Sequence, residues 1–336
     1  MSPRRFPRRA GWRAAAATLL AGALVGACRT APRAARAPAG DAPFSIAILG
    51  DMPYMTAGMP TYAAAERQYH ALLDTIARRP VAAVVHVGDI TGAVCSDSLY
   101  ALRRREFDAL PHPVLYTPGD NEWTDCARNG FEPLERLAAL RRVFFADDSS
   151  LGRRRIAVER QSAAPRFGTY RENARWRLGA VRFATLHVVG SNDNWGRDTV
   201  PSAEFTARRI ATLAWLDSTF ALAARERARG VVILMQANPN LEGPAGRGQQ
   251  RGVDAFVAVR AALQRHAAAF GGPVALVHGD SHYFRVDKPF TDPRSGGQLM
   301  NLTRAETFGN PSEHGLLLTV EPSNPNLFRF EPILVP

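Results

Sequence analysis

One pattern constrains the fold of this chain more than any other: a short apolar segment that stops abruptly at polar residues, five times over. The segments are rich in β-branched residues and lack alternation, which is typical of strands buried on both faces of a sheet. The loops after them carry acidic, amide or imidazole side chains, and four of the five contain Gly-Asp. The segments are Ser45–Leu49, Val81–Val87, Val114–Tyr116, Val231–Met235 and Val274–Val277.

Segments with helical periodicity separate these strands. In Tyr62–Arg79, for example, Tyr69, Leu72 and Ile76 fall on one face of a helix. The other predicted helices are Leu99–Leu110, Leu134–Phe145, Ala203–Arg229 and Val253–Phe270. Alternating strands and helices predict a layered α/β fold in one large domain, residues 44–336.

Two further regions favour strands without helices. Gly179-Ala180 divides Arg171–Val189 into a predicted hairpin. The end of the chain contains three more predicted strands, Leu299–Thr303, Gly315–Val320 and Leu327–Leu334. A helix-covered part is therefore expected to precede a more β-rich part.

The polar loops are expected to lie together, because ligands of α/β folds bind beyond the carboxyl ends of the strands. A glycine before an aspartate allows a sharp turn that directs the carboxylate into such a crevice. The loops therefore predict a divalent metal centre, with Asp51, Asp89, Asn121 and His282 as its best candidate ligands.

From about Ile46 to His282, the order of these loops resembles that of the calcineurin-like metallophosphoesterase family. The family pattern runs Asp-x-His, Gly-Asp, Gly-Asn-His-Asp/Glu, a lone His after a strand, and Gly-His-x-His. Asp51 matches its first Asp, Asp89 the metal-bridging Asp, and His282 the last His. The resemblance implies a calcineurin-like layered β-sandwich flanked by helices, in the order α/β/β/α.

The third motif of the family can be aligned with this chain in two ways. In Gly119-Asp120-Asn121-Glu122, Asp120 stands where the family has Asn, and Asn121 stands where it has the catalytic His. A shift of one residue would instead make Asn121 the metal ligand. Both residues remain candidate ligands, and the resemblance makes Asn121 and Asp89 the candidate catalytic residues.

Other positions depart from the family pattern. Pro53 replaces the His of the first motif, Gln236 the lone His, and Asp280 the first His of the last motif. His278 is a candidate to compensate for one of these losses. Tyr54 is a candidate to supply an oxygen, although packing is the simpler interpretation of a tyrosine.

The resemblance implies two divalent metal ions that clamp a phosphate ester while a metal-activated hydroxide attacks phosphorus. Oxygen ligands outnumber imidazoles in this chain, which favours manganese, magnesium, calcium or iron over zinc. Without the third-motif His, a general-acid contribution of about 10²–10⁴-fold would be missing, so esters with good leaving groups would be affected least. The full set of candidate metal ligands is Asp51, Asp89, Asp120, Asn121, Gln236, His278, Asp280 and His282.

The first residues indicate export. Five arginines precede the apolar run Ala14–Ala27, which is too short to span a bilayer. Small residues before Cys28 resemble the lipobox of bacterial lipoproteins, so residues 1–27 are a predicted signal peptide and Cys28 the lipidated residue. The alternative is an ordinary secretory signal cleaved nearby. Residues 28–43, rich in Ala, Pro and Arg, are expected to tether the domain to a membrane of the periplasm or cell envelope.

Cys95 and Cys126 remain as a pair once Cys28 is lipidated. In an oxidising compartment, such a pair predicts a disulfide. The bridge would pin together the loops that contain Asp89 and Asn121. Two unrelated buried thiols are the alternative.

The net charge of +11 is weak evidence for a nucleic-acid partner. Five of these charges lie in the predicted signal segment, which leaves +6 for the rest. Lys288 is the only lysine among 42 basic residues, a bias that a GC-rich genome explains better than a phosphate-binding surface. Arginine clusters such as 103–105 fit solvated faces.

The sequence therefore favours an exported, lipid-tethered, metal-dependent phosphoester hydrolase. Its expected substrate is a phosphorylated small molecule or a nucleotide-like monoester or diester. One alternative is a catalytically weakened or inactive binding lipoprotein of the same fold, which the missing histidines favour. A metal-dependent nuclease, which the positive charge favours, is the other alternative.

Overall fold

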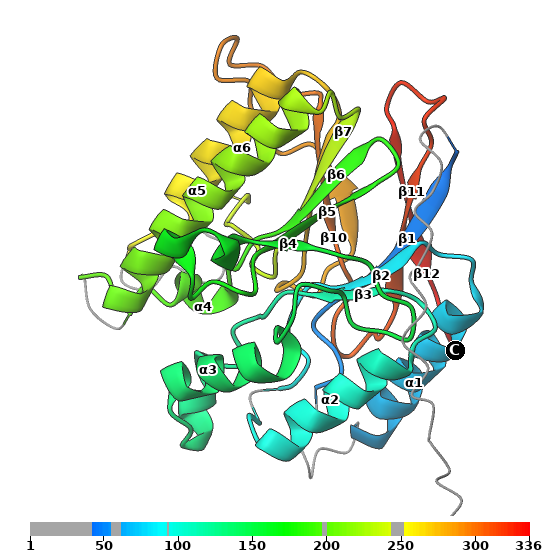
Figure 1. The fold of residues 1–336 in the computed structure, drawn as a ribbon, viewed down its shortest axis with the longest axis vertical. Helices are drawn as coiled ribbons and strands as arrows, with labels where there is room; N and C mark the ends of the chain where they lie inside the picture. The colour runs from blue at the N-terminus through cyan, green and yellow to red at the C-terminus, as the bar shows by residue number, and fades with distance from the viewer. Residues whose placement is uncertain (1–41, 55–61, 93, 197–199, 243–251) are drawn as a thin grey trace, which may run out of the picture. The chain divides into compact units, whose positions relative to one another are not determined.

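The computed structural model describes residues 42–54, 62–92, 94–196, 200–242 and 252–336. In this part of the chain two β-sheets pack against each other, and helices cover the outer face of each sheet (Figure 1). The layers have the order α/β/β/α, so the fold class expected from the sequence is confirmed.

The first sheet has five strands in the order β12-β11-β1-β2-β3. β1 (Phe44–Leu49), β2 (Ala83–His86) and β3 (Val114–Tyr116) are parallel. β11 (Gly315–Val320) pairs antiparallel with β1 and with β12 (Phe328–Ile333). The loops after β1, β2 and β3 therefore leave the sheet at the same edge.

The second sheet has seven strands in the order β4-β5-β6-β7-β8-β10-β9. Its parallel centre consists of β6 (Val181–Thr185), β7 (Gly230–Leu234), β8 (Val274–His278) and β10 (Leu302–Glu306). Antiparallel strands flank this centre: β4 (Glu159–Arg160), β5 (Ala174–Leu178) and β9 (Arg285–Asp287).

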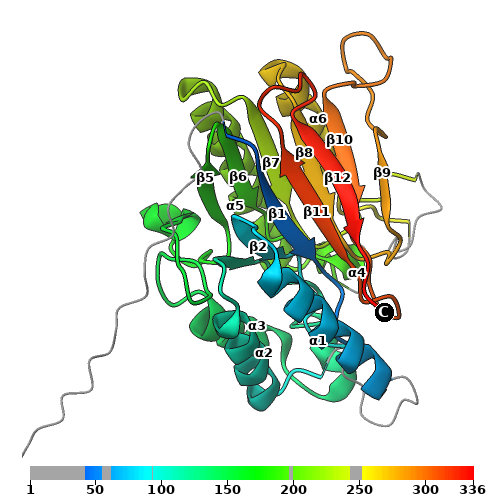
Figure 2. The ribbon, with the colours of Figure 1, turned by 90° about the vertical axis from the view of Figure 1, so that its right-hand side faces the viewer.

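Helices lie on the outer face of each sheet (Figures 1 and 2). The first sheet is covered by α1 (Tyr62–Arg78), α2 (Asp97–Ala109) and α3 (Pro133–Phe144). The second is covered by α5 (Ala203–Arg225) and α6 (Val257–Phe270). The short helices are α4 (Gly190–Asp193) and the 3-10 turns η1 (Asp125–Asn129), η2 (Gln161–Ala163) and η3 (Pro165–Phe167).

Strand β1 shows why the apolar runs lack alternation. Ile46 and Ile48 pack between the two sheets, whereas Ala47 and Leu49 pack in the cluster that includes Tyr69 of α1. All four side chains are almost inaccessible to solvent. Because both faces of the strand are covered, both need apolar residues.

The observed elements match the predicted ones closely, with three exceptions. The last strand of the second sheet is Leu302–Glu306 rather than Leu299–Thr303, because Leu299 instead donates its N–H to the loop carbonyl of Phe290. β4 and β9 were not predicted, since they are short edge strands rich in charged residues. The C-terminal strands also form no separate β-rich part, because β10 joins one sheet and β11 and β12 join the other.

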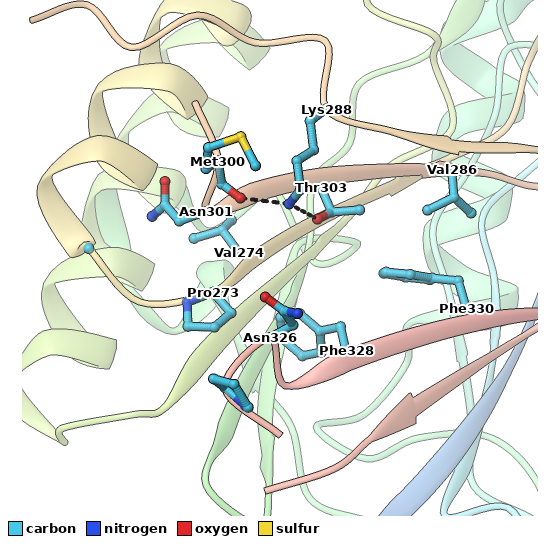
Figure 3. Close-up of a pocket in the computed structure, with 12 residues that line it drawn as sticks. Pro273, Val274, Val286, Lys288, Met300, Asn301, Thr303, Asn326, Phe328 and Phe330 are labelled. Atoms are coloured by element: carbon cyan, nitrogen blue, oxygen red, sulfur yellow. Dashed lines mark hydrogen bonds between the residues drawn. The ribbon is translucent and has the colours of Figure 1, made fainter. Parts of the chain in front are cut away.

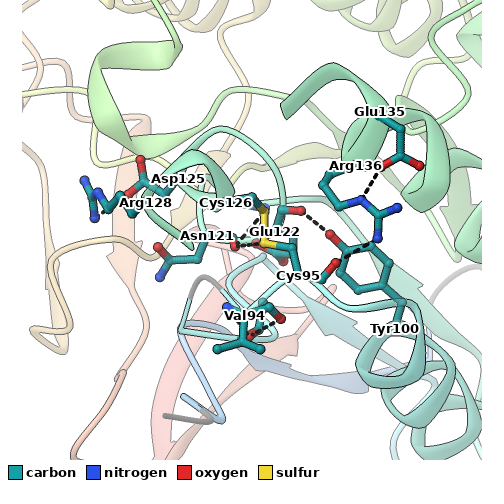
Figure 4. The surroundings of a disulfide bond; sticks show 12 residues. Val94, Cys95, Tyr100, Asn121, Glu122, Asp125, Cys126, Arg128, Glu135 and Arg136 are labelled. Carbon is teal, nitrogen blue, oxygen red and sulfur yellow. Dashed lines mark hydrogen bonds and ion pairs between the residues drawn. A yellow bond between two sulfur atoms is a disulfide. The ribbon is translucent and has the colours of Figure 1, made fainter. Parts of the chain in front are cut away.

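The predicted disulfide is confirmed: Cys95 and Cys126 are bonded, with their Cα atoms 5.8 Å apart (Figure 4). It joins the loop after β2 to η1, as expected from the positions of the two cysteines. Among the described residues, no helix is long and apolar enough to cross a membrane. The predicted signal peptide, Cys28 and nearly all of the tether lie outside the described residues.

Candidate active site

Hydrogen bonds join all five predicted loops at the carboxyl ends of the parallel strands. Asp51, directly after β1, accepts the N–H of Asp280, which follows β8, at 3.0 Å on each carboxylate oxygen. Gln236, after β7, donates its Nε2 to Asp120 (3.1 Å) and to Asp280 (3.4 Å). The loops of both sheets therefore meet at one site, as strand-end geometry predicts.

Asp89 lies where the loops after β1, β2 and β3 meet. Its Oδ1 accepts the backbone N–H of Asn121 (3.1 Å), and its Oδ2 accepts the side-chain Nδ2 of Asn121 (3.0 Å). The Tyr54 hydroxyl donates to the same Oδ2 at 2.9 Å. Asn121 and Tyr54 thus hold the Asp89 carboxylate from two sides.

Tyr54 also connects Asp89 to His282. Its hydroxyl lies 2.9 Å from His282 Nε2, and the tyrosine and imidazole rings meet edge to face. His282 Nδ1 lies 2.6 Å from the carbonyl oxygen of Asn310, which can only accept, so Nδ1 carries a proton. In neutral His282, Nε2 is then an acceptor. Since a hydroxyl has one proton, Tyr54 cannot donate to Asp89 and His282 Nε2 together.

Asp120 extends the site towards a loop that sequence reasoning did not include among the ligand loops. The Ser191 hydroxyl, in the loop after β6, donates to Asp120 Oδ2 at 2.7 Å. The backbone N–H of Gly190 donates to Gln236 Oε1 at 2.6 Å. A Cβ on Gly190 would come within 2.5 Å of Asp280 and 2.8 Å of Asp120, so this loop packs tightly against the carboxylates.

Several of these residues need an unusual backbone conformation. Asp51, Asp89, Asp280 and His282 all have positive φ, between 55° and 79°. Such conformations are uncommon for residues other than glycine and persist where the surrounding structure determines them. A side chain at Gly279 would also collide with the Asp51 carboxylate. The turns therefore direct the carboxylates inwards at a cost in backbone energy.

The carboxylates raise one another's pKa. Burial, and then the negative charge of Asp280, hold the pKa of Asp51 well above its usual value. Burial and the charge of Asp120 do the same for the pKa of Asp89. The pKa of Asp280 rises to about 8 for the same two reasons. Within the described residues, no lysine or arginine forms an ion pair with these four aspartates; the nearest basic group is His282 Nε2, 3.7 Å from Asp51 Oδ1.

Charge and donor type both fit a divalent cation. Closely spaced aspartate oxygens with amide oxygens and one imidazole are ligands that hard ions prefer. A cation would also offset the repulsion between the carboxylates. In the described structure, however, no group of three or more His, Cys, Asp or Glu side chains is arranged so that it could hold an ion. Hydrogen-bond donors occupy several of these oxygens instead, so binding requires side-chain rearrangement.

His278 is the predicted candidate that lies apart from the others. Ala275 and Val277 of β8 pack between the sheets, so the alternation of the strand directs His278 to the opposite face. Its Nδ1 lies 2.8 Å from the carbonyl oxygen of Gly279, and burial lowers its pKa to about 3. The period of the strand was the signal that could have placed His278 on the opposite face, whereas Asp280 lies beyond the end of β8 in a turn with positive φ.

A cavity of about 620 Å³ lies elsewhere, at the opposite ends of the strands (Figure 3). It is lined by Val274 at the start of β8 and Phe328 at the start of β12, and Lys288 lies beside it. The Lys288 Nζ donates to Met300 O and Thr303 Oγ1. None of the polar loops reaches this cavity, so it is not the site described above.

Comparisons with known proteins agree with the fold. No family model matches the sequence, and no curated protein matches it. Among solved structures, the chain is similar to a dimetal phosphatase from Danio rerio, with 16% identity, a TM-score of 0.55, and coverage of 82% of this chain and 92% of that one. It is also similar to PhoD, with 15% identity and a TM-score of 0.54, over 85% of this chain and 66% of that one. At these identities the similarity establishes a shared fold.

Proposed function

We propose that this protein is a metal-dependent phosphoester hydrolase. The observation that carries the proposal is the group of aspartates at the carboxyl ends of both sheets. Hydrogen bonds hold Asp51, Asp120 and Asp280 together and tie Asp89 to Asn121 and Tyr54, and among the described residues no lysine or arginine is paired with any of the four. The fold shared with a dimetal phosphatase supports this choice of chemistry.

Asp51, Asp89 and His282 would hold one divalent ion, and Asp120, Asp280 and Gln236 or Asn121 a second. Bound ions would supply an activated water and positive charge for the phosphoryl group. The few imidazoles among these ligands favour manganese, magnesium or iron over zinc.

The remaining contacts act on the leaving group and on ligand orientation. Asn121 stands where the resembled family has its catalytic His. Its side-chain amide donates to Asp89 and has no titratable proton, so it cannot protonate the leaving alcohol. Glu122 orients the loops by accepting the N–H groups of Ile90 (3.0 Å) and Gly119 (3.2 Å). Esters with good leaving groups should therefore be the best substrates.

The location proposed for this enzyme is the cell envelope, with a lipid on Cys28. The Cys95–Cys126 disulfide supports an oxidising compartment. Replacing Cys28 with Ser should move the protein from the membrane to the soluble envelope fraction without changing the activity of the purified domain. Membrane retention of the C28S protein would contradict the lipid anchor.

A second candidate is a binding protein of the same fold without efficient chemistry. The hydrogen bonds that occupy the oxygens of Asp51 and Asp89 favour it, since an ion must displace some of them. The experiment that separates the candidates is turnover of aryl phosphates, aryl phosphodiesters, DNA and RNA with added Mn²⁺.

In that experiment the wild type should hydrolyse an aryl phosphoester only with metal. Asp89→Asn should abolish this turnover, and Asp217→Asn, an exposed position on α5, should not change it. Metal binding without turnover would support the binding protein instead. Preferential cleavage of DNA or RNA would support a nuclease.

A further inference from the structure

A second cavity, of about 300 Å³, is lined in part by Ser191, whose hydroxyl donates to Asp120. One wall is η1 and the residues around it, including Thr124, Asp125 and Arg128. The loop after β6 forms the other wall with Ser191, Asn194 and Gly196. The cavity is lined mainly by polar groups, whereas the cavity at the opposite ends of the strands combines apolar side chains with Lys288, Asn301, Thr303 and Asn326.

Contacts between the two walls connect Asp120 to the guanidinium group of Arg128. Ser191 Oγ donates to Asp120 Oδ2 (2.7 Å) and lies 2.9 Å from Asp125 Oδ1. The other oxygen of Asp125, Oδ2, pairs with Arg128 Nη1 at 2.8 Å. Ser191 and Asp125 therefore connect the lining of the cavity to Asp120.

Both walls are held in fixed positions. Ser191, Asn192, Asp193 and Asn194 have φ between 49° and 56°, a left-handed turn that L-residues avoid. On the other side, Cys126 of η1 is anchored by the disulfide to Cys95 (Figure 4). Strained turns with this kind of support occur where a binding surface has to be kept in shape.

Arg128 has N–H groups that its ion pair with Asp125 does not use. Its side chain is 68% exposed, and its ion pair with Asp125 uses one of its three nitrogens. In the described part of the chain it makes no other hydrogen bond or ion pair. A guanidinium with free N–H groups at the mouth of a cavity is suited to a carboxylate or phosphate.

We propose that this cavity binds the alcohol side of the substrate and that Arg128 pairs with a second negative charge on it. The substrate is then a phosphoester whose leaving group is itself anionic. This inference rests on the proposed phosphoester hydrolysis, because it assigns the part of the substrate that lies away from phosphorus.

The test compares phenyl phosphate with 4-carboxyphenyl phosphate, which differ by one negative charge. The ratio of their kcat/KM values is measured for each protein with Mn²⁺, so that the intrinsic reactivity of the two esters cancels between proteins. Arg128→Ala should lower the ratio of the carboxylated to the plain ester about tenfold, mainly through KM. Arg128→Lys, which keeps the charge, should recover part of the preference.

Arg142→Ala is the matched control. The Arg142 side chain on α3 is also 68% exposed and paired with one acid, Glu135 at 3.8 Å, but it does not line the cavity. For Arg142→Ala, the ratio of kcat/KM for the carboxylated ester to kcat/KM for the plain ester should equal that of the wild type. An Arg128→Ala ratio equal to that of the wild type would overturn the inference while leaving the hydrolase intact. If the wild type hydrolyses neither these esters nor any ester of the wider panel, the proposed function fails and the inference with it.

Discussion

Two groups of buried acids in this protein differ in whether positively charged side chains are paired with them. Glu172 is paired with Arg141 (2.6 Å) and His187 (2.8 Å), and Asp193 with Arg208 (2.5 Å). We call these residues the paired cluster. The aspartate cluster, Asp51, Asp89, Asp120 and Asp280, has no lysine or arginine partner within the described structure.

The difference is visible in the pKa values of Glu172 and Asp280, whereas at Asp193 the charge of Arg208 only partly offsets burial, which raises its pKa to about 6. Although burial raises the pKa of Glu172, the charge of Arg141 and the hydrogen bond with His187 hold it below its usual value. In the aspartate cluster, burial and neighbouring charges act in the same direction, and the pKa of Asp280 reaches about 8. In the paired cluster, Arg141 and Arg208 thus supply the positive charge. In the aspartate cluster, the missing charge has to come from a cation or from protons.

The largest effect is expected at Asp51. Asp51→Asn should lower metal-dependent hydrolysis roughly a thousandfold, since a metal ligand is lost. The same change should stabilise the protein in chelator, because it removes a negative charge from a group that has no cation. Steady-state kinetics and chemical denaturation measure the two effects. A variant that is less stable than the wild type in chelator would contradict the account of Asp51.

The paired cluster should respond in the opposite sense. Arg141→Met leaves Glu172 buried without its arginine and should cost about 3 kcal/mol of unfolding free energy. Manganese affinity should not change. Arg142→Met, the exposed neighbour on the same helix, should cost less than about 0.5 kcal/mol. Equal losses in the two variants would show that the pairing of Glu172 contributes nothing particular.

The pH dependence of stability should separate the clusters further. The folded-state pKa of Asp280, about 8, lies above the roughly 3.9 of an unfolded chain. Between these values the folded protein holds a proton that the unfolded chain has lost, so stability in chelator should fall as pH rises from 5 to 8. Asp280 should contribute up to about 1.4 kcal/mol per pH unit to this slope, and the raised pKa values of Asp51 and Asp89 should steepen it further.

Asp280→Asn should flatten this slope, and saturating Mn²⁺ should flatten it in the wild type. Denaturation curves at pH 5, 6.5 and 8 provide the measurement. A wild-type slope that persists unchanged in Asp280→Asn would assign the titration to another group.

The smallest effect is expected at Tyr54. Tyr54→Phe removes the hydroxyl that donates to Asp89 and should cost about 1 kcal/mol in chelator. With saturating Mn²⁺ the loss should shrink, because the ion takes over the Asp89 oxygen. Tyr283→Phe, an exposed control, should leave the free energy of unfolding unchanged in both conditions. The same loss with and without metal would mean that the hydroxyl and the ion do not share a position.

Sequence reasoning predicted the frame of the site well. Two-sided burial leaves apolar runs in the sequence, and Gly-Asp after four of the five runs marks a sharp turn. The positions of Asp51, Asp89 and Asp280 at the strand ends therefore follow from local patterns. The Cys95–Cys126 bridge follows because these two cysteines remain as a pair once Cys28 is assigned to lipidation.

The contacts between the loops could not be predicted in the same way. Tyr54 reaches His282, and Ser191 reaches Asp120, only because two sheets pack with particular loops facing each other. The left-handed turn from Ser191 has no glycine signature beyond Gly190. Such contacts depend on tertiary packing, which local propensity does not encode.

The most direct test of the central claim is metal binding by the aspartate cluster. Chelated wild-type protein, Asp89→Asn and Asp217→Asn are dialysed against Mn²⁺ at pH 7.5, and the bound metal is quantified per chain. The account predicts stoichiometric Mn²⁺ in the wild type and in Asp217→Asn, and its loss from Asp89→Asn. Equal Mn²⁺ in all three proteins, or none in the wild type, would contradict it.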